Sequence, residues 1–463
     1  MDTDASQRSA DVLRALREAL PGRVVEDPGA LTEYTTDRSG HRSAGVPLAC
    51  VRARSIEDVQ AVCRIASSGG HPVVTRGAGS GLAGGAVAGP GEIVLLLEDM
   101  DRVLEVSAEN RLAVVEPGIL NGDLNALLAE HGLWWPPDPA SKDFSTVGGN
   151  IAMNAGGLLC AKYGVTREAV LALKVVLADG TLLSVGHRTV KGVTGYDLCA
   201  LMIGSEGTLG VIVECTLKLQ PLRSGTVVTI GAYFDSVDAA AAVASAVVRD
   251  GFVPAIMELM DDRTLTAIAT AGGQDPTAAA ESYLLVQCDG ADAEDAARGI
   301  AALAEAGGGR VAVTRDPAES ERLVAVRRSA FPALEAMGTL LVEDIAVPRD
   351  RLAEAFTAIR RIEERYQVAI PTTAHAGDGN LHPTFVFTDR EVPHHIWEAA
   401  GEVFGLALEL GGTLTGEHGV GLLKRAWLQD ELGEDQYELS RRIKQVFDPQ
   451  GIMNPGKVFP AGA

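Results

Sequence analysis

Two glycine-flanked stretches in the last quarter of the chain combine histidines with a carboxylate. The first, "HAGDGNLHP", carries His375 and His382, and the second, "GEHG", places Glu417 beside His418. Two imidazoles and one carboxylate form a donor set with open coordination positions, as in catalytic Zn²⁺, Mn²⁺ and Fe²⁺ sites. One continuous strand would point the two rings to opposite faces, whereas a turn at Gly-Asp-Gly-Asn can bring them together. The two histidines alone fit a polar hairpin equally well, and the carboxylate shifts the balance toward a metal site.

A glycine-rich loop follows the predicted strand "HPVVTR". It contains Gly79, Gly81 and Gly84 in the GxGxxG spacing of dinucleotide-binding proteins. In those proteins the glycines open a helix, but the following Gly-Ala-Val-Ala-Gly-Pro-Gly cannot sustain one, so we do not expect a Rossmann fold. Successive backbone N–H groups of such a loop can still surround a phosphate, with Arg76 adding charge at the edge. The competing interpretation is a connector that needs unusual backbone angles.

Two further stretches mix glycine with small polar residues. They are "PPDPASKDFSTVGGNIAMNAGG", residues 136–157, and "TGYDLCALMIGSEGTLGVI", residues 194–212. Their serine, threonine and asparagine side chains supply donors and acceptors with little bulk, which suits the lining of a large, flat ligand with polar edges. Taken singly, each stretch also fits ordinary turn chemistry.

Arginines and the remaining histidines offer further candidates. Arg327 and Arg328 are adjacent in "AVRRSAFPALEAMG", on a predicted helix. An arginine fork suits the carboxylate of an acidic substrate, although most such pairs are solvated. We expect His394 and His395 to be solvated, and His71 to face solvent at the start of a strand.

The composition excludes several classes of partner. The chain has 62 acidic and 40 basic residues, a net charge of -22, and no Lys/Arg-rich run, so neither nucleic acid nor an anionic membrane is expected as a partner. It shows no signal-peptide pattern and no apolar run near the ~18 residues of a transmembrane segment. Six scattered cysteines without a C-x-x-C pair fit a reducing cytoplasm. We expect a cytoplasmic protein, peripheral to the membrane only through a partner.

The first half of the chain alternates short β-branched runs with helical patterns, from about Leu48 to Leu222. At 55–67 the apolar residues recur at the helical period behind a serine cap. "KLQPLRSG", with its proline, predicts a linker at the end of this block. An amphipathic helix precedes the block.

The second half reads as strands interleaved with alanine-rich helices. The strands include "GTVVTIGAYF", "SYLLVQCDG", "GRVAVTRD" and "TLLVEDIAVP", and the helices lie near 236–249, 292–306 and 350–366. This spacing is typical of an antiparallel or mixed sheet layered with helices, and it makes the fold class α+β. A last helix ends at Asp448-Pro449.

The three glycine stretches, in this order and with the histidine stretches behind them, resemble one branch of the vanillyl-alcohol oxidase/p-cresol methylhydroxylase superfamily. That branch comprises FAD-linked 2-hydroxy acid dehydrogenases, including the glycolate oxidase D subunit, D-lactate dehydrogenases and D-2-hydroxyglutarate dehydrogenases. The resemblance runs from about residue 40 to the end of the chain. It implies a two-subdomain FAD-binding domain at 46–224 and an antiparallel-sheet-plus-helices cap, or substrate, domain at 225–445. Residues 1–45 would pack on the FAD domain as a helical segment, and 446–463 would return to it as a tail.

The resemblance also implies roles for individual residues. His375, His382 and Glu417 would bind a divalent metal, with Zn²⁺ or Mn²⁺ expected, and Asp378 and Asn380 would support them. Asp378 and Asn380 are equally candidates for forming the turn itself. His418 would be the catalytic base and Arg327 would bind the substrate carboxylate. The glycine loop holds no histidine for covalent attachment, so FAD is expected to bind noncovalently. The implied FAD-binding residues are Arg76, Gly77, Ala78, Gly79, Ser80, Gly81, Leu82, Pro137, Ser141, Gly148, Asn150, Ala152, Asn154, Glu206, Gly210, Ile212 and Asn454.

The resulting hypothesis is FAD-dependent oxidation of a small (R)-2-hydroxy acid, of the glycolate or D-lactate type, to the 2-oxo acid. The lysine that 2-hydroxyglutarate-type relatives use is absent from "TLLVEDIAVP", and Thr384 replaces their asparagine, which disfavours a long dicarboxylate. The electron acceptor would be external: a quinone, a flavoprotein, a cytochrome or an iron–sulfur subunit. The alternatives are a D-2-hydroxyglutarate-type dehydrogenase, a metal-dependent hydrolase, an FAD-holding subunit without turnover, and a non-redox flavoenzyme acting on an ether-lipid precursor. The oligomeric state stays open, with a homodimer as one option.

Overall fold

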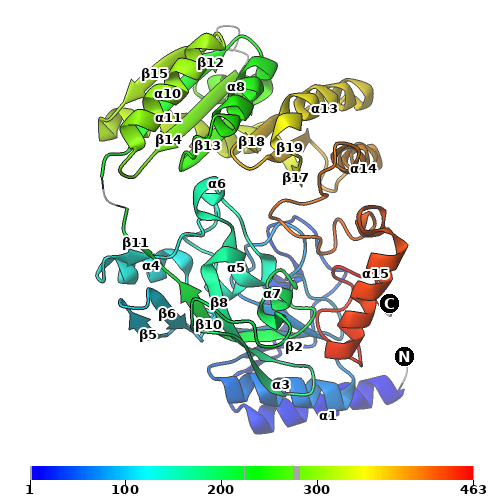
Figure 1. The fold of residues 1–463 in the computed structure, drawn as a ribbon. Helices are drawn as coiled ribbons and strands as arrows, with labels where there is room; N and C mark the ends of the chain where they lie inside the picture. Colours follow the sequence, from blue (N-terminus) through cyan, green and yellow to red (C-terminus); the bar gives the residue numbers. More distant parts are fainter. Residues whose placement is uncertain (1–2, 224, 275–281, 462–463) are drawn as a thin grey trace. The chain divides into compact units, whose positions relative to one another are not determined.

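The computed structural model describes residues 3–223, 225–274 and 282–461. The chain divides into two compact units that alternate along the sequence (Figure 1). The first unit comprises residues 1–155, 165–222 and 417–463, and the second comprises 156–164 and 223–416. The first unit therefore takes in more of the C-terminal region than the proposed tail, and the second includes a short excursion from within the proposed FAD-binding domain.

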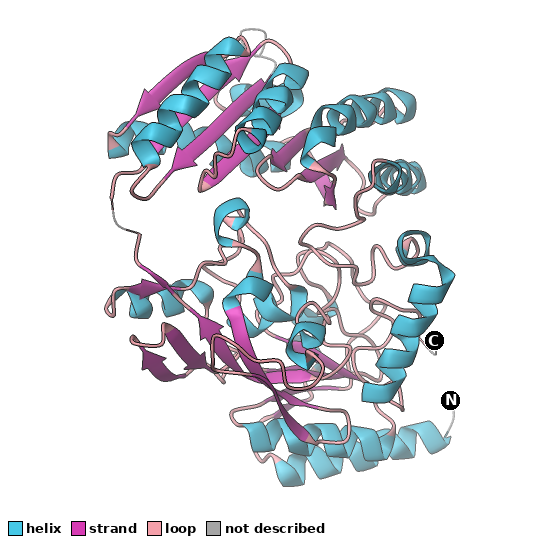
Figure 2. Cartoon of the chain, viewed as in Figure 1, coloured by secondary structure: helices cyan, strands magenta, loops and turns pink. Residues whose placement is uncertain are grey.

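The first unit contains both helices and strands (Figure 2). Its strands are β1 (Val24–Val25), β2 (Ala49–Arg52), β3 (Val73–Arg76), β4 (Ile93–Leu96), β5 (Val103–Ser107), β6 (Leu112–Val115), β7 (Leu133–Trp134), β8 (Val170–Val176), β9 (Leu182–Gly186), β10 (Val211–Lys218) and β11 (Gln220–Pro221). Its helices are α1 (Thr3–Ala19), α2 (Pro28–Leu31), α3 (Ile56–Gly69), α4 (Asn121–Ala129), α5 (Val147–Met153), α7 (Leu198–Met202) and α15 (Leu428–Phe447).

Two sheets organise the first unit. One has the order β1-β2-β4-β3, with β2 and β3 each parallel to β4, and the other is antiparallel with the order β5-β6-β10-β8-β9. Every residue of β4 and β6 is buried, as their unbroken apolar runs predict. Helix α3 begins at the predicted cap, where the Ser55 side chain accepts from the Asp58 amide, and ends at Gly70 with a left-handed φ of 64°. The two subdomains expected from the sequence are thus present, each with its own apolar core.

The second unit is built on one large sheet. Its strands are β12 (Val228–Phe234), β13 (Ile256–Asp261), β14 (Ser282–Cys288), β15 (Arg310–Thr314), β16 (Thr339–Val342), β17 (Ile345–Ala346), β18 (Thr372–His375) and β19 (Asn380–Phe387). Its helices are α6 (Cys160–Tyr163), α8 (Val237–Arg249), α9 (Asp262–Ala271), α10 (Ala293–Ala306), α11 (Pro317–Arg328), α12 (Ala330–Glu335), α13 (Leu352–Tyr366) and α14 (His394–Glu409).

The sheet of the second unit has the order β15-β12-β14-β13-β18-β19-β16, and β17 pairs with β19 off this path. Every pairing is antiparallel, as expected for the cap. Helices α8 and α10 pack together on this sheet (Figure 1). Helix α12 packs against α9 and α11, which also contact strands of the sheet. The alanine-rich helices lie where the sequence predicts them. Strand β13 was not predicted, and it carries a residue of the candidate site.

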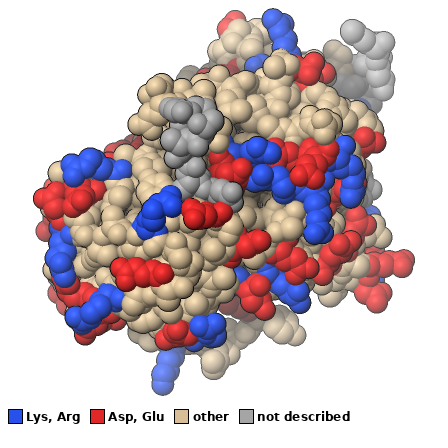
Figure 3. Space-filling view, turned by 90° about the horizontal axis from the view of Figure 1, so that it is seen from above, with Lys and Arg blue, Asp and Glu red and all other residues tan. Residues whose placement is uncertain are grey.

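In the described part of the chain no helix is long and apolar enough to cross a membrane. On the face shown in Figure 3, acidic and basic side chains are interspersed and form no basic stripe. The loop after β3 contains no helix before β4, so the GxGxxG match does not mark a Rossmann unit, as predicted.

Candidate functional site

The predicted turn between His375 and His382 exists, and it brings the two rings together. Strands β18 and β19 form a hairpin, the histidine hairpin, in which Thr373 stands opposite His382. His375 lies two residues beyond Thr373 on the same strand, so both imidazoles project from one face of the sheet. Their ring centroids are 4.9 Å apart and nearly perpendicular, and both residues are buried. The stretch is therefore a polar hairpin, and its geometry also places two ligand-type side chains side by side.

Glu417 completes the candidate donor set. It follows Gly416, the last residue of the second unit, and one ligand atom from each of Glu417, His375 and His382 lies within 4.8 Å of the others. Ligand atoms of a site with bonds of about 2.0–2.2 Å are at most about 4.4 Å apart. The three side chains therefore need only small movements to enclose an ion. Their two nitrogens and one oxygen fit Zn²⁺ or Mn²⁺.

A buried aspartate fixes the backbone that leads into Glu417. Asp344 is fully buried and accepts hydrogen bonds from the Thr415 hydroxyl, at 2.9 Å, and from the Gly416 amide, at 2.6 Å. A Cβ at Gly416 would lie 2.3 Å from Nδ2 of Asn380, so a side chain there would displace the Asn380 amide. The sequence interpretation did not include Asp344. The acidic pair Glu343-Asp344 inside an apolar strand run was the available signal.

The residues between the two histidines serve the turn. Asp378 accepts the Asn380 amide at 3.2 Å, and the Asn380 side chain donates to the Ile345 carbonyl at 2.8 Å. Gly379 has a left-handed φ of 88°, and a Cβ there would lie 2.1 Å from the Val347 carbonyl oxygen. The turn is thus held by its own side chains and by close backbone contact with the neighbouring strand connection.

Glu258 of β13 links His375 to Arg327. Register pairs Glu258 directly with His375, and their side chains share one face of the sheet. His375 Nδ1 lies 2.6 Å from one carboxylate oxygen of Glu258, and Arg327 Nε donates to the other at 2.8 Å. Arg327 is therefore an ordered arginine with a side chain 19 % exposed, whereas its neighbour Arg328 pairs with Glu321 and is 65 % exposed.

Glu258 was missed in the sequence because its strand was missed. Its side chain is fully buried. Burial alone raises the pKa of this carboxyl, but His375 and Arg327 outweigh that effect and hold the pKa below its ordinary value. One charged residue inside the apolar run "IMELM" was the available signal, because a carboxylate is seldom buried without partners.

His418 belongs to a turn that Glu206 holds within the first unit. Glu206 accepts the amides of Val420 and Gly421 at 2.8 and 2.7 Å. Burial raises the Glu206 pKa to about 7, although those amides and Lys424 oppose the rise. A Cβ at Gly419 would lie 3.0 Å from Oε1 of Glu206, which keeps the turn close to it. His418 itself is mostly buried, with Nε2 3.9 Å from the Glu417 carboxylate.

The glycine loop of the first unit is constrained at two points. A Cβ at Gly77 would lie 2.2 Å from the Thr146 hydroxyl, and one at Gly79, where φ is 64°, would lie 2.2 Å from Nη2 of Arg76. Arg76 donates to the carbonyls of Thr36 and Ala86 at 3.0 and 2.9 Å. Its guanidinium therefore braces the loop. The loop keeps its shape without the helix that a Rossmann unit would use.

Of the other residues proposed to line FAD, Gly148, Asn150 and Ala152 lie in α5, and Asn154 caps its C-terminal end. Gly148 lies against Pro117, and Pro137 accepts a hydrogen bond from Asn121 at 2.9 Å. The carbonyl of Ala152 accepts the Glu206 amide at 2.9 Å. Three of the proposed residues have packing or capping contacts instead of a free polar edge: Asn154 accepts the Arg167 amide, Gly210 lies against Val175, and Ile212 is buried in the core.

Four buried polar atoms near these residues have no hydrogen-bond partner among the described residues: Thr75 Oγ1, Ser145 Oγ, Asn150 Nδ2 and Asn454 Oδ1. Asn454 donates its Nδ2 to the carbonyls of Gly85 and Glu206, so the C-terminal tail contacts the glycine stretches within the first unit. Buried polar groups are seldom left unsatisfied. This set fits the polar edges and ribityl hydroxyls of a flavin nucleotide, and Thr75 and Ser145 extend the residues proposed from the sequence.

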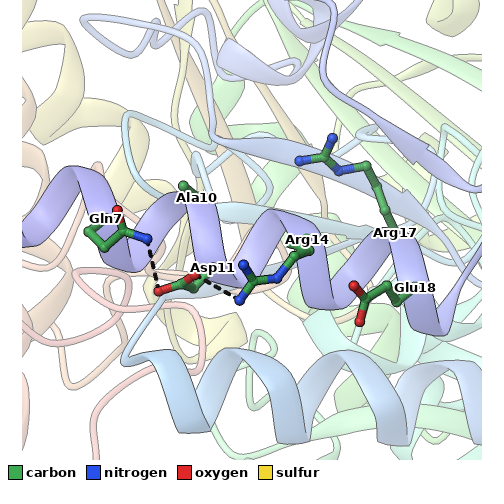
Figure 4. A pocket seen from close by; sticks show the side chains of 6 residues that line it. All are labelled: Gln7, Ala10, Asp11, Arg14, Arg17 and Glu18. Atoms are coloured by element: carbon green, nitrogen blue, oxygen red, sulfur yellow. Dashed lines mark hydrogen bonds and ion pairs between the residues drawn. The ribbon is translucent and has the colours of Figure 1, made fainter.

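Other candidates do not form sites. His394 and His395 are exposed, as expected, but His71 is buried and bonds the Gly91 carbonyl at 3.1 Å, so the solvent-facing assignment was wrong. Val73, the first residue of β3, is also fully buried and belongs to an apolar core. A shallow hollow runs along α1 (Figure 4), but Arg14 pairs with Asp11 within it and a single surface helix supplies its lining: Gln7, Ala10, Asp11, Arg14, Arg17 and Glu18.

Comparison with known proteins identifies the family. Residues 47–186 match the FAD binding domain, and residues 224–458 match the C-terminal domain of FAD linked oxidases. The glycolate oxidase subunit GlcD of Bacillus subtilis (strain 168) is 37% identical over 448 residues, which cover 96% of this chain and 93% of that protein. D-lactate dehydrogenase of Anaerostipes hadrus is 35% identical, with 97% of each chain covered.

Solved structures show the same fold at low identity. The p-cresol methylhydroxylase structure with substrate bound has a TM-score of 0.81 and 17% identity, covering 98% of this chain and 97% of that one. An alkyldihydroxyacetonephosphate synthase structure has a TM-score of 0.74 and 18% identity, covering 96% and 85%. The chain is therefore an FAD-linked oxidoreductase that belongs to the FAD-linked oxidase family, together with the glycolate oxidase and D-lactate dehydrogenase chains that it resembles.

Proposed function

We propose that this oxidoreductase converts a small (R)-2-hydroxy acid, of the glycolate or D-lactate type, to the 2-oxo acid. The names of its relatives, glycolate oxidase subunit and D-lactate dehydrogenase, support the substrate class. The single observation that carries the proposal is the donor set of His375, His382 and Glu417, with an arginine tied to the same buried carboxylate as one of its histidines. A 2-hydroxy acid carries a hydroxyl next to a carboxylate. The ion site suits the hydroxyl, and the arginine suits the carboxylate.

The ion site and Arg327 bind and orient the acid. His375, His382 and Glu417 would hold a divalent ion, Zn²⁺ or Mn²⁺, and the Arg327 fork binds the substrate carboxylate. When bound, noncovalent FAD supplies the hydride acceptor and the ion supplies Lewis acidity. Thr384, buried on β19, replaces the asparagine of 2-hydroxyglutarate-type relatives, and this supports a short substrate.

His418 takes the proton from the substrate hydroxyl at one of its ring nitrogens. Its turn is fixed by Glu206 and by the close approach of Gly419 and Gly421 to the first unit's backbone and side chains. The hydride and the proton together remove two electrons and two protons from the acid, and these balance formation of the 2-oxo acid. The electrons then pass to an external acceptor: a quinone, a flavoprotein, a cytochrome or an iron–sulfur subunit.

The test is anaerobic bleaching of the flavin absorbance. We expect a yellow protein with acid-extractable FAD, bleached by D-lactate or glycolate and left oxidised by L-lactate. Because no FAD-site residue is altered, His418→Ala should retain FAD and metal while bleaching at least about 100-fold more slowly. His394→Ala, at an exposed histidine, is the matched control and should bleach normally.

Two results would count against this function. A protein that takes up FAD but is not bleached by any short 2-hydroxy acid of either hand would reject the substrate class. Normal bleaching of His418→Ala would reject the assigned base and leave the substrate class standing. Faster bleaching by D-2-hydroxyglutarate than by D-lactate would correct the substrate to a longer acid.

A further inference from the structure

Glu258 has no role in the reaction proposed above. It lies on β13, outside the glycine and histidine stretches, and its side chain has no exposed surface. Each of its two carboxylate oxygens meets one partner: Oε1 lies 2.6 Å from His375 Nδ1, and Oε2 accepts from Arg327 Nε at 2.8 Å. All three residues belong to the second unit.

The contact with His375 decides which nitrogen can bind an ion. An ionised carboxylate only accepts hydrogen bonds, so Nδ1 of His375 must carry the proton that it donates to Glu258. The lone pair of the neutral ring is then on Nε2. Such a carboxylate–histidine pair fixes the ring's tautomer and orientation and makes the ring a better ligand. The sheet enforces the geometry, because Glu258 and His375 are directly opposed in the β13–β18 register.

The contact with Arg327 decides which part of the guanidinium is available. Glu258 accepts from Nε, so the two terminal amino groups, with four N–H donors, remain to form a fork around a carboxylate. Arg327 lies in the last turn of α11, and its side chain keeps 19 % of its surface exposed. A carboxylate bound there would meet an arginine whose direction is already set.

We propose that Glu258 is a shared positioning residue, which sets the tautomer of the metal ligand His375 and the direction of the substrate-binding Arg327 at the same time. One buried carboxylate thereby couples the ion site to the carboxylate site. The inference rests on the proposed function, since it assigns work to residues that the proposed function places in the ion and substrate sites. It adds a residue that touches neither substrate nor cofactor.

The test compares Glu258→Gln with Glu116→Gln. Glu116 is also buried and pairs with an arginine, Arg102, but it lies in the first unit, so it controls for the loss of a buried ion pair. Mn²⁺ is titrated calorimetrically into metal-stripped, FAD-loaded protein, and the KM for D-lactate is measured by flavin reduction. We expect Glu258→Gln to bind Mn²⁺ about 10–100-fold more weakly and to raise KM about tenfold, with unchanged FAD content. Glu116→Gln should lose thermal stability alone.

A second variant guards against simple misfolding. Glu258→Asp keeps the charge but is one methylene shorter, so it cannot span both partners. We expect this variant to fold and to keep one of the two contacts. It should therefore change Mn²⁺ affinity and the KM for D-lactate to unequal extents. Folded, FAD-loaded Glu258→Gln with Mn²⁺ affinity and KM within twofold of wild type would overturn the inference. Wild-type protein that neither binds Mn²⁺ nor is bleached by D-lactate would instead overturn the proposed function.

Discussion

Gly379 offers the sharpest structural test of the histidine hairpin, because two separate costs oppose a side chain there. Its φ of 88° lies in the left-handed region, which costs a non-glycine residue about 1–2 kcal/mol. A Cβ would also lie 2.1 Å from the Val347 carbonyl oxygen, so the turn must move by about 1 Å to accept it. Forced overpacking of this kind adds about 1–3 kcal/mol. Gly379→Ala should therefore lower the free energy of unfolding by about 2–5 kcal/mol.

Gly411 provides the matched control within the same unit. Its φ is 78°, but no atom lies within 4 Å of a Cβ built on it. Gly411→Ala should carry only the backbone cost of about 1–2 kcal/mol. The difference between the two variants isolates the contact with Val347. In a unit of this size, each kcal/mol of that difference lowers Tm by about 2–4 °C.

The two variants should also differ in metal binding. Because Gly379 lies between His375 and His382, moving the turn separates the rings, and Gly379→Ala should bind Mn²⁺ at least about tenfold more weakly. Gly411→Ala should bind it normally. Circular dichroism measures Tm, and calorimetric titration of FAD-loaded protein measures Mn²⁺ affinity. Equal Tm values for the two variants, or wild-type Mn²⁺ affinity in Gly379→Ala, would refute the reasoning.

Three further predictions follow from the charges and the division into units. Arg327→Lys should raise the KM for D-lactate about tenfold, because an ammonium cannot form the two-pronged contact of a guanidinium. Arg328→Lys, at an exposed arginine, should leave KM unchanged. Equal KM values for the two variants would show that Arg327 does not bind the carboxylate. Chelation of the metal should abolish flavin bleaching reversibly without releasing FAD, because His375 and His382 lie in the second unit and the proposed FAD residues lie in the first. Loss of the yellow colour together with the metal would contradict this prediction. Asp261, which caps α9, has its pKa raised by burial from 3.8 to about 7, so the folded state holds a proton that the unfolded state releases near pH 4. Its contribution to stability should be fully present below pH 4, fall as the pH rises to about 7 and then level off. The part lost between pH 5 and pH 8 is on the order of 2–3 kcal/mol. Urea unfolding of wild type and Asp261→Asn at these two pH values should therefore show a smaller pH dependence in the variant.

Much of the candidate site could be predicted from residue types and local spacing. Gly-Asp-Gly-Asn between His375 and His382 is turn chemistry whatever surrounds it, and the poor helix formers after Gly84 already argued against a Rossmann unit. Local periodicity likewise located α3, α8, α10 and α13, because their apolar faces repeat within a single segment. These features depend on neighbours in the sequence.

What the sequence could not indicate depends on pairing between distant segments. Glu258 becomes meaningful only because β13 and β18 are adjacent in one sheet, although more than a hundred residues separate the partners. The same is true of Asp344 and the turn before Glu417. His71 was misassigned for a related reason: burial of a strand's first residue depends on what packs over it, and local pattern does not report that.

The sequence by itself therefore determined the chemistry available to this protein: a histidine and carboxylate donor set, a glycine loop with polar neighbours, and an arginine pair. The family resemblance singled out Arg327 from that pair. Only the tertiary structure decided the register that turns both histidines to one face, and the buried carboxylate that joins His375 to Arg327. The physical reason is that residue type fixes what a side chain can donate or accept, whereas strand order and register fix which donor meets which acceptor.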